Sequence, residues 1–149
     1  MTELIGQALG QYQVMAEVGK GGMATVYQAT QSTMKRTVAI KILPRALTHD
    51  GKFLERFYRE VEIAASLQHP HILPVYDFGT YEDLPYIVMA YMSGGTLADL
   101  IAQGAMSVEM VLRTVGQMAE ALDYAHSKGV IHRDFKPGNV LLDEKRNTY

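Results

Sequence analysis

The sequence contains no cysteine and carries little net charge. The absence of cysteine excludes disulfides and metal sites that use thiolate ligands. A formal charge of −2 gives the chain no strong field that would attract nucleic acid or acidic lipid. We therefore expect no nucleic-acid partner.

Long apolar runs are also missing. The most apolar stretch, residues 84–92, is far shorter than the ~20 residues that a helix needs to cross a bilayer. The first residues include Glu3 and have neither a basic region nor a sustained apolar stretch, so a signal peptide is not supported. We expect a cytoplasmic protein with no membrane contact from this segment.

The composition is that of a packed domain, because 48% of the 149 residues are hydrophobic and 20% are charged. Segments rich in β-branched and aromatic residues predict strands at 12–18, 24–29, 37–43, 73–80, 86–90 and 140–142. Apolar residues at helical spacing predict helices at 50–68, 96–103 and 107–128. Asp50 is a candidate N-cap, and Gly129 is placed for a left-handed C-terminal cap. The order is a β-rich part with one helix, then a mainly helical part, with a boundary near Ser93-Gly94-Gly95.

A glycine turn, Gly19-Lys20-Gly21-Gly22, separates the first two strands. It does not fit a P-loop, because Lys20 is followed by glycine instead of Ser or Thr. It does not open a helix, because the next residues are strand-like. The turn therefore predicts a hairpin, either without a ligand or with a backbone that approaches phosphates closely.

A lysine stands in an apolar strand at position 41. An unpaired ammonium facing an apolar space would be costly, and a carboxylate on the following helix would relieve that cost. Glu60 lies on the apolar stripe of that helix and is preferred to Glu62. The alternative is a lysine that extends to solvent and a solvated glutamate.

The segment His132-Arg133-Asp134, Lys136 and Asn139 has the residue types of a phosphate-transfer loop. A hydroxyl is a poor nucleophile, so transfer benefits from a carboxylate base and from cations that absorb charge on the phosphate. Asp134 would be the base and Lys136 would reach the γ-phosphate. The side-chain oxygen of Asn139 would bind Mg²⁺, which prefers oxygen ligands.

Taken in order, these segments make the whole chain resemble the eukaryotic-type protein kinases, and in particular the bacterial Ser/Thr kinases. The similarity covers residues 19–26, Val38-Ala39-Ile40-Lys41, Glu60, His69-Pro70, Ser93-Gly94-Gly95 and residues 132–139. Gly21-Gly22-Met23-Ala24 before Val26-Tyr27 is similar to the bacterial members. Lys136, two residues after the aspartate, is similar to kinases specific for Ser/Thr.

The resemblance implies an α+β, protein-kinase-like fold. Residues 1–11 would form an N-terminal extension, 12–92 an antiparallel sheet lobe with one helix and the ATP-binding loop, and 93–149 the start of a helical lobe. It also implies ATP and Mg²⁺ as cofactors, and a protein substrate with a Ser or Thr hydroxyl.

The resemblance assigns nucleotide contacts residue by residue. Val18, Val26, Ala39 and Leu141 would enclose the adenine, and main-chain groups of Ala90 and Met92 would bind its edge. Met89 is similar to the gatekeeper. Lys41, held by Glu60, would contact the α- and β-phosphates, beneath the loop residues Gly19, Lys20, Gly21, Gly22, Met23 and Ala24. His132 would be a scaffold residue, and Arg133 would pair with a phosphorylated residue.

Several positions depart from the family pattern. Ala24 replaces the third glycine of the loop, Ala90 the usual Glu, and Phe135 the usual Leu. No Asp-Phe-Gly and no activation segment follow the loop at 132–139 within the 149 residues. We therefore expect the N-terminal half of a catalytic domain, marginally folded and weakly active or inactive alone, that self-associates through an exposed helical face.

Two other functions remain open. One is a non-catalytic nucleotide-binding or regulatory module. The other is a small-molecule kinase of similar fold, although Lys136-Pro137 fits protein kinases better.

Overall fold

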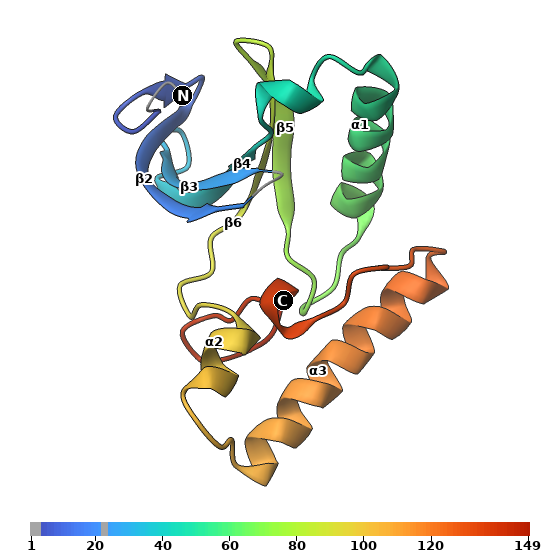
Figure 1. The fold of residues 1–149 in the computed structure, drawn as a ribbon. Helices are drawn as coiled ribbons and strands as arrows, with labels where there is room; N and C mark the ends of the chain where they lie inside the picture. The colour runs from blue at the N-terminus through green and yellow to red at the C-terminus, as the bar shows by residue number, and fades with distance from the viewer. Residues whose placement is uncertain (1–3, 22–23) are drawn as a thin grey trace. The chain divides into compact units, whose positions relative to one another are not determined.

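The computed structural model describes residues 4–21 and 24–149. The chain forms two compact units (Figure 1). Unit 1 comprises Met1–Ser66 and Pro74–Tyr91, and unit 2 comprises Leu67–Leu73 and Met92–Tyr149. The expectations for Gly22 and Met23 lie outside the described residues. None of the helices in the described ranges has the length and apolar character required to cross a membrane.

Unit 1 is built on a six-stranded antiparallel sheet with the order β1-β2-β3-β4-β6-β5 (Figure 1). Its strands are β1 (Ala8–Leu9), β2 (Tyr12–Lys20), β3 (Thr25–Gln31), β4 (Arg36–Ile42), β5 (Val75–Tyr81) and β6 (Leu84–Ala90). Five were predicted from their β-branched and aromatic residues. β1 has no predicted counterpart, and it lies within residues 1–11, which were expected to form an N-terminal extension.

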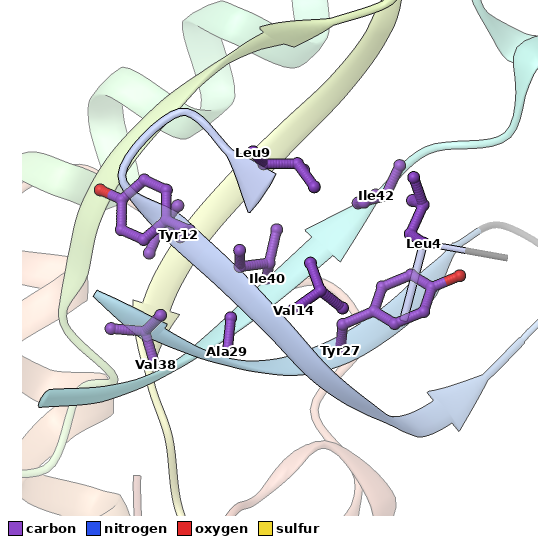
Figure 2. Packing of buried hydrophobic residues seen from close by; sticks show 10 residues of the cluster. Leu4, Leu9, Tyr12, Val14, Tyr27, Ala29, Val38, Ile40 and Ile42 are labelled. Carbon is purple, nitrogen blue, oxygen red and sulfur yellow. The ribbon is translucent and has the colours of Figure 1, made fainter. Parts of the chain in front are cut away.

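The core of unit 1 lies on one face of this sheet. Alternate residues of β4, namely Val38, Ile40 and Ile42, are buried there, because successive side chains of a strand point to opposite faces. Figure 2 shows Leu9 and Val14 gathered around Ile40. The residues before β2 thus contribute to the core as well as to the sheet.

Helix α1 (Gly51–Ser66) follows a short 3₁₀ turn, Arg45–Leu47. The Asp50 carboxylate accepts hydrogen bonds from the backbone N–H groups of Lys52 and Phe53 at 3.0 and 3.3 Å, which confirms it as the cap. The helix packs on the edge strand β5 (Figure 1). The hydroxyls of Tyr58 on α1 and Thr80 on β5 are 2.7 Å apart. It ends two residues earlier than predicted.

Unit 2 contains α2 (Leu97–Ala102) and α3 (Val108–Ser127). Thr96 and Asp99 form a reciprocal capping box at the start of α2, and the Ser107 hydroxyl accepts from the Met110 N–H at the start of α3. Gly129 follows α3 with φ +76°, the left-handed cap predicted from sequence.

The predicted strand at 140–142 forms two isolated bridges instead of a regular strand. Leu141 pairs with Thr96, and Leu142 pairs with Thr148. The segment is short and turns back at once, so no longer ladder can form. It buries Val140 and Leu142 against Leu97 and Leu100 of α2.

Candidate functional site

The sheet of unit 1 places several predicted nucleotide contacts on one face. Val26 pairs with Lys41 across β3 and β4, and Ala39 pairs with Met89 across β4 and β6. Directly paired residues share a face, and Ala39 and Lys41 are two residues apart. Val26, Ala39, Lys41 and Met89 therefore lie together, on the face opposite the buried Ile40 cluster.

The glycine turn forms the hairpin that the sequence predicted. Gly19 pairs with Val26, Lys20 pairs with Thr25, and the Gly21 N–H donates to the Ala24 carbonyl at 2.9 Å. The pairing shifts register between Glu17 and Gly19, so Val18 lies at a bulge, where it is 45% exposed.

The expected pair between Lys41 and Glu60 is not formed. Within residues 4–21 and 24–149, neither side chain has an ion pair within 4.0 Å, and both are exposed. Helix α1 packs on β5, which is separated from β4 by β6. Both charges are solvated here, so the burial cost that motivated the pairing does not arise.

The other residues expected to contact adenine belong to different units. The Ala90 N–H donates to the Pro74 carbonyl at 3.0 Å, so this donor of Ala90 is already used within unit 1. Met92 and Leu141 belong to unit 2.

The three predicted catalytic side chains meet in unit 2. The Lys136 ammonium lies 3.2 Å from Asp134 Oδ2. The Asn139 side-chain amide donates to the same oxygen at 3.1 Å and to the Asp134 carbonyl at 2.9 Å. A 3₁₀ turn, Pro137–Asn139, folds the chain back so that Asn139 reaches Asp134. The spacing of these residues therefore corresponds to one compact cluster.

The electrostatics of the cluster favour an ionised aspartate. The hydrogen bond from Lys136, then that from Asn139 and the charge of Lys136, hold the pKa of Asp134 below its usual value. The side chains of Asp134 and Lys136 are 69% and 58% exposed. The carboxylate is thus charged and open to solvent, as a group that accepts a proton from an incoming hydroxyl must be.

The donor set fits a magnesium ion that is shared with nucleotide phosphates. No group of three or more His, Asp or Glu residues that could hold a metal occurs in the described part of the chain. Mg²⁺ usually takes one or two protein oxygens together with phosphate oxygens and water. Because the Asn139 amide nitrogen faces Asp134, its side-chain oxygen remains as the candidate ligand.

Sequence reasoning did not identify an apolar pocket of about 240 Å³ beside this cluster. It lies within unit 2, between α3, the 67–73 segment and the chain end. His132, Phe135 and Asn139 reach it from the 132–139 segment. No local pattern marks it, because its walls come from segments far apart in the chain.

Comparisons with known proteins agree on one family. The protein kinase domain family matches residues 12–148. The chain is 42% identical over 146 residues to serine/threonine-protein kinase PrkC of Bacillus subtilis, an alignment that covers 97% of this chain and 22% of the relative. It is 40% identical over 137 residues to serine/threonine-protein kinase PknJ of Mycobacterium tuberculosis, which covers 92% of this chain and 23% of that protein.

Among solved structures, the PknI kinase domain of Mycobacterium tuberculosis superposes with a TM-score of 0.82 and 36% identity. The match covers 96% of this chain and 59% of that domain. The chain thus spans just over a fifth of these curated relatives' length and nearly three fifths of the solved domain. The α+β, protein-kinase-like fold is confirmed, and the chain belongs to the protein kinase family.

Proposed function

We propose that this chain carries the nucleotide-binding strands and the catalytic loop of a bacterial-type serine/threonine protein kinase. The reaction transfers the γ-phosphoryl group of ATP to a Ser or Thr hydroxyl of a protein substrate. The observation that supports this proposal most strongly is the convergence of Asp134, Lys136 and Asn139.

Each member of the cluster has a distinct role in the proposed reaction. Asp134 orients the substrate hydroxyl and takes its proton, while the hydroxyl oxygen bonds to the γ-phosphorus and the bond to ADP breaks. Lys136 moves from Asp134 to the γ-phosphate and offsets its charge. Asn139 holds Mg²⁺, which neutralises phosphate charge when bound with ATP.

The sheet face of unit 1 supplies the nucleotide contacts in this proposal. Val26, Ala39 and Met89 present apolar surface to the adenine, and Lys41 binds the α- and β-phosphates. We propose that Glu60 pairs with Lys41 in the ATP-bound form, since bound phosphates draw the ammonium away from bulk solvent.

The first experiment measures ATP binding by calorimetry with Mg²⁺ and with EDTA. We expect Lys41→Met to weaken binding by about 10-fold or more, because a charge-assisted contact to phosphate is lost. Lys52→Met, which removes an exposed lysine of α1, is the matched control. Equal affinities for the two variants would contradict the assignment of Lys41.

The second experiment measures transfer of radiolabelled phosphate to a general protein substrate, with phosphoamino-acid analysis of the product. We expect slow transfer by the 149-residue chain, because no Asp-Phe-Gly follows the 132–139 loop in it to supply a further Mg²⁺ ligand. The one such tripeptide, Asp77-Phe78-Gly79, precedes the loop and lies on β5. Any label should appear on Ser or Thr and should disappear in Asp134→Asn. Label on Tyr, or transfer that survives this substitution, would contradict the proposal.

A non-catalytic nucleotide-binding module is the second candidate. The unpaired Lys41 and Glu60 favour it, since the phosphate-binding lysine is not held in place. ATP binding that is unchanged by EDTA, with no detectable transfer, would support this alternative.

A further inference from the structure

The residue that follows Asp134 departs from the family pattern and makes a specific contact. The rings of Phe135 and His132 meet edge to face, with centroids 5.7 Å apart and planes at 85°. Such T-shaped pairs are favourable because the positive edge of one ring meets the negative face of the other. The leucine usual at this position has no ring and could not form this pair.

His132 in turn contacts the backbone of Asp134. The Asp134 N–H donates to His132 Nδ1 at 3.3 Å. Nδ1 must therefore be unprotonated, and the proton of the neutral ring is on Nε2. Rotation of the imidazole about its χ angles would remove this acceptor from Asp134.

The backbone between these two residues is strained. Arg133 has φ +66°, a left-handed conformation that a non-glycine residue adopts only at a cost. Residues 131–139 are all exposed, so burial does not impose this conformation on the segment. Local contacts must therefore hold the left-handed conformation of Arg133. The hydrogen bond from the Asp134 N–H to His132 Nδ1 joins the residues on either side of it.

We propose that Phe135 is a positioning residue that acts on Asp134 through His132. Its ring holds the imidazole in the orientation that accepts the Asp134 N–H, and this hydrogen bond holds the strained turn that presents the Asp134 carboxylate. The inference rests on the proposed catalytic role of Asp134, but the contacts themselves can be tested without nucleotide.

The first measurement is long-range ¹H–¹⁵N NMR of the His132 ring in the unaltered chain at about pH 8.5, where imidazole is neutral. We expect the proton on Nε2. A proton on Nδ1 would overturn the proposal, because that nitrogen could not accept from Asp134.

The second measurement is hydrogen exchange of the Asp134 amide in Phe135→Leu and Phe135→Tyr. We expect exchange to be about 2- to 10-fold faster in the leucine variant, as the loss of an aromatic pair predicts. The tyrosine variant keeps the ring and should match the unaltered chain. Unchanged exchange in the leucine variant, or equally fast exchange in the tyrosine variant, would overturn the proposal.

The Leu97 amide, which donates to the Val140 carbonyl at 2.8 Å in the same unit, reports general loss of structure. If its exchange also rises in Phe135→Leu, Phe135→Met provides a second apolar replacement without a ring. Faster exchange confined to Asp134 in that variant supports the proposal. Loss of protection at Leu97 in both variants would instead assign Phe135 a purely structural role.

Discussion

The two units differ in how much apolar surface each of them buries. Unit 1 has a core cluster in which Val38, Ile40 and Val88 are fully buried. Unit 2 has a core cluster of four residues on α2 and the 140–142 segment, while on α3 Val108 and Leu112 remain 76% and 69% exposed. The proposed nucleotide face thus lies on a well-packed sheet, whereas the proposed catalytic cluster of Asp134, Lys136 and Asn139 lies on a weakly buried unit. Substitutions in the two units should therefore change the free energy of unfolding by different amounts.

The largest expected effect is on the core of unit 1. Ile40→Ala should lower the free energy of unfolding by about 3 kcal/mol, because it leaves a cavity in a fully buried site. Amide exchange resolved by residue should show the loss of protection first in β2, β3 and β4. Thr37→Ala, at an exposed position of the same strand, is the control. Equal losses for the two variants would mean that the cluster around Ile40 contributes little.

In unit 2, the free energy of unfolding should respond in opposite directions to alanine at two glycines, Gly94 and Gly116. A methyl group at Gly94 would meet the backbone carbonyls of Leu142 and Asp143, so Gly94→Ala should cost about 2 kcal/mol. A methyl group at Gly116 on α3 meets nothing within 4 Å, so Gly116→Ala should add about 0.5–1 kcal/mol. Urea denaturation measures both. The two substitutions should change the free energy of unfolding in opposite directions. Destabilisation by both would contradict the open space around Gly116.

A smaller effect should appear in unit 1 at alkaline pH. Burial and the 2.8 Å hydrogen bond to Asp77 raise the pKa of Tyr12 to about 12, against about 10 in an unfolded chain. Between these values the unfolded state loses the proton and the folded state keeps it, so stability should fall as pH rises from about 10 to about 12.

Denaturation at a series of pH values measures this slope, that is, the decrease in the free energy of unfolding per pH unit. Tyr12→Phe should flatten it and should cost about 1 kcal/mol at neutral pH, since a hydrogen bond to a carboxylate is lost. Tyr91→Phe is the control, because the Tyr91 hydroxyl has no hydrogen-bond partner within residues 4–21 and 24–149. An undiminished slope in Tyr12→Phe would assign the pH dependence to another group.

The smallest effect on stability is expected at the exposed face of α3, where we propose self-association. Leu112→Glu should shift sedimentation velocity profiles towards monomer while changing the free energy of unfolding by about 0.5 kcal/mol or less. Ala98→Glu, at an exposed position of α2, adds the same charge elsewhere in unit 2. Identical profiles for the two variants would show that the α3 face does not mediate association.

Local sequence signals predicted most elements of both units. Each of these signals depends on the conformation of a few neighbouring residues, so a short stretch of sequence is enough to predict it. Examples are the β-branched strands, the Asp50 cap and the glycine after α3. The contacts among Asp134, Lys136 and Asn139 could also be predicted, because these residues are close in the chain and a single turn joins them.

Features that depend on distant partners were not readable in this way. β1 has only two residues, and its position in the sheet depends on its pairing with β2. The walls of the pocket come from several segments that are far apart in the chain. The Lys41–Glu60 pair was inferred from burial that neither residue has in the folded unit. Periodicity gives the face of an element, but it does not give the distance between two elements.

The packing of Leu4 and Leu9 has a practical consequence for choosing where a shortened protein should start. The match to the kinase family model begins at residue 12, yet both leucines fill the interior against Val14 and Ile40 (Figure 2). A protein trimmed to residues 12–148 would expose the surface that these leucines cover. Expression should therefore retain residue 4 onward, ahead of the start of the family match.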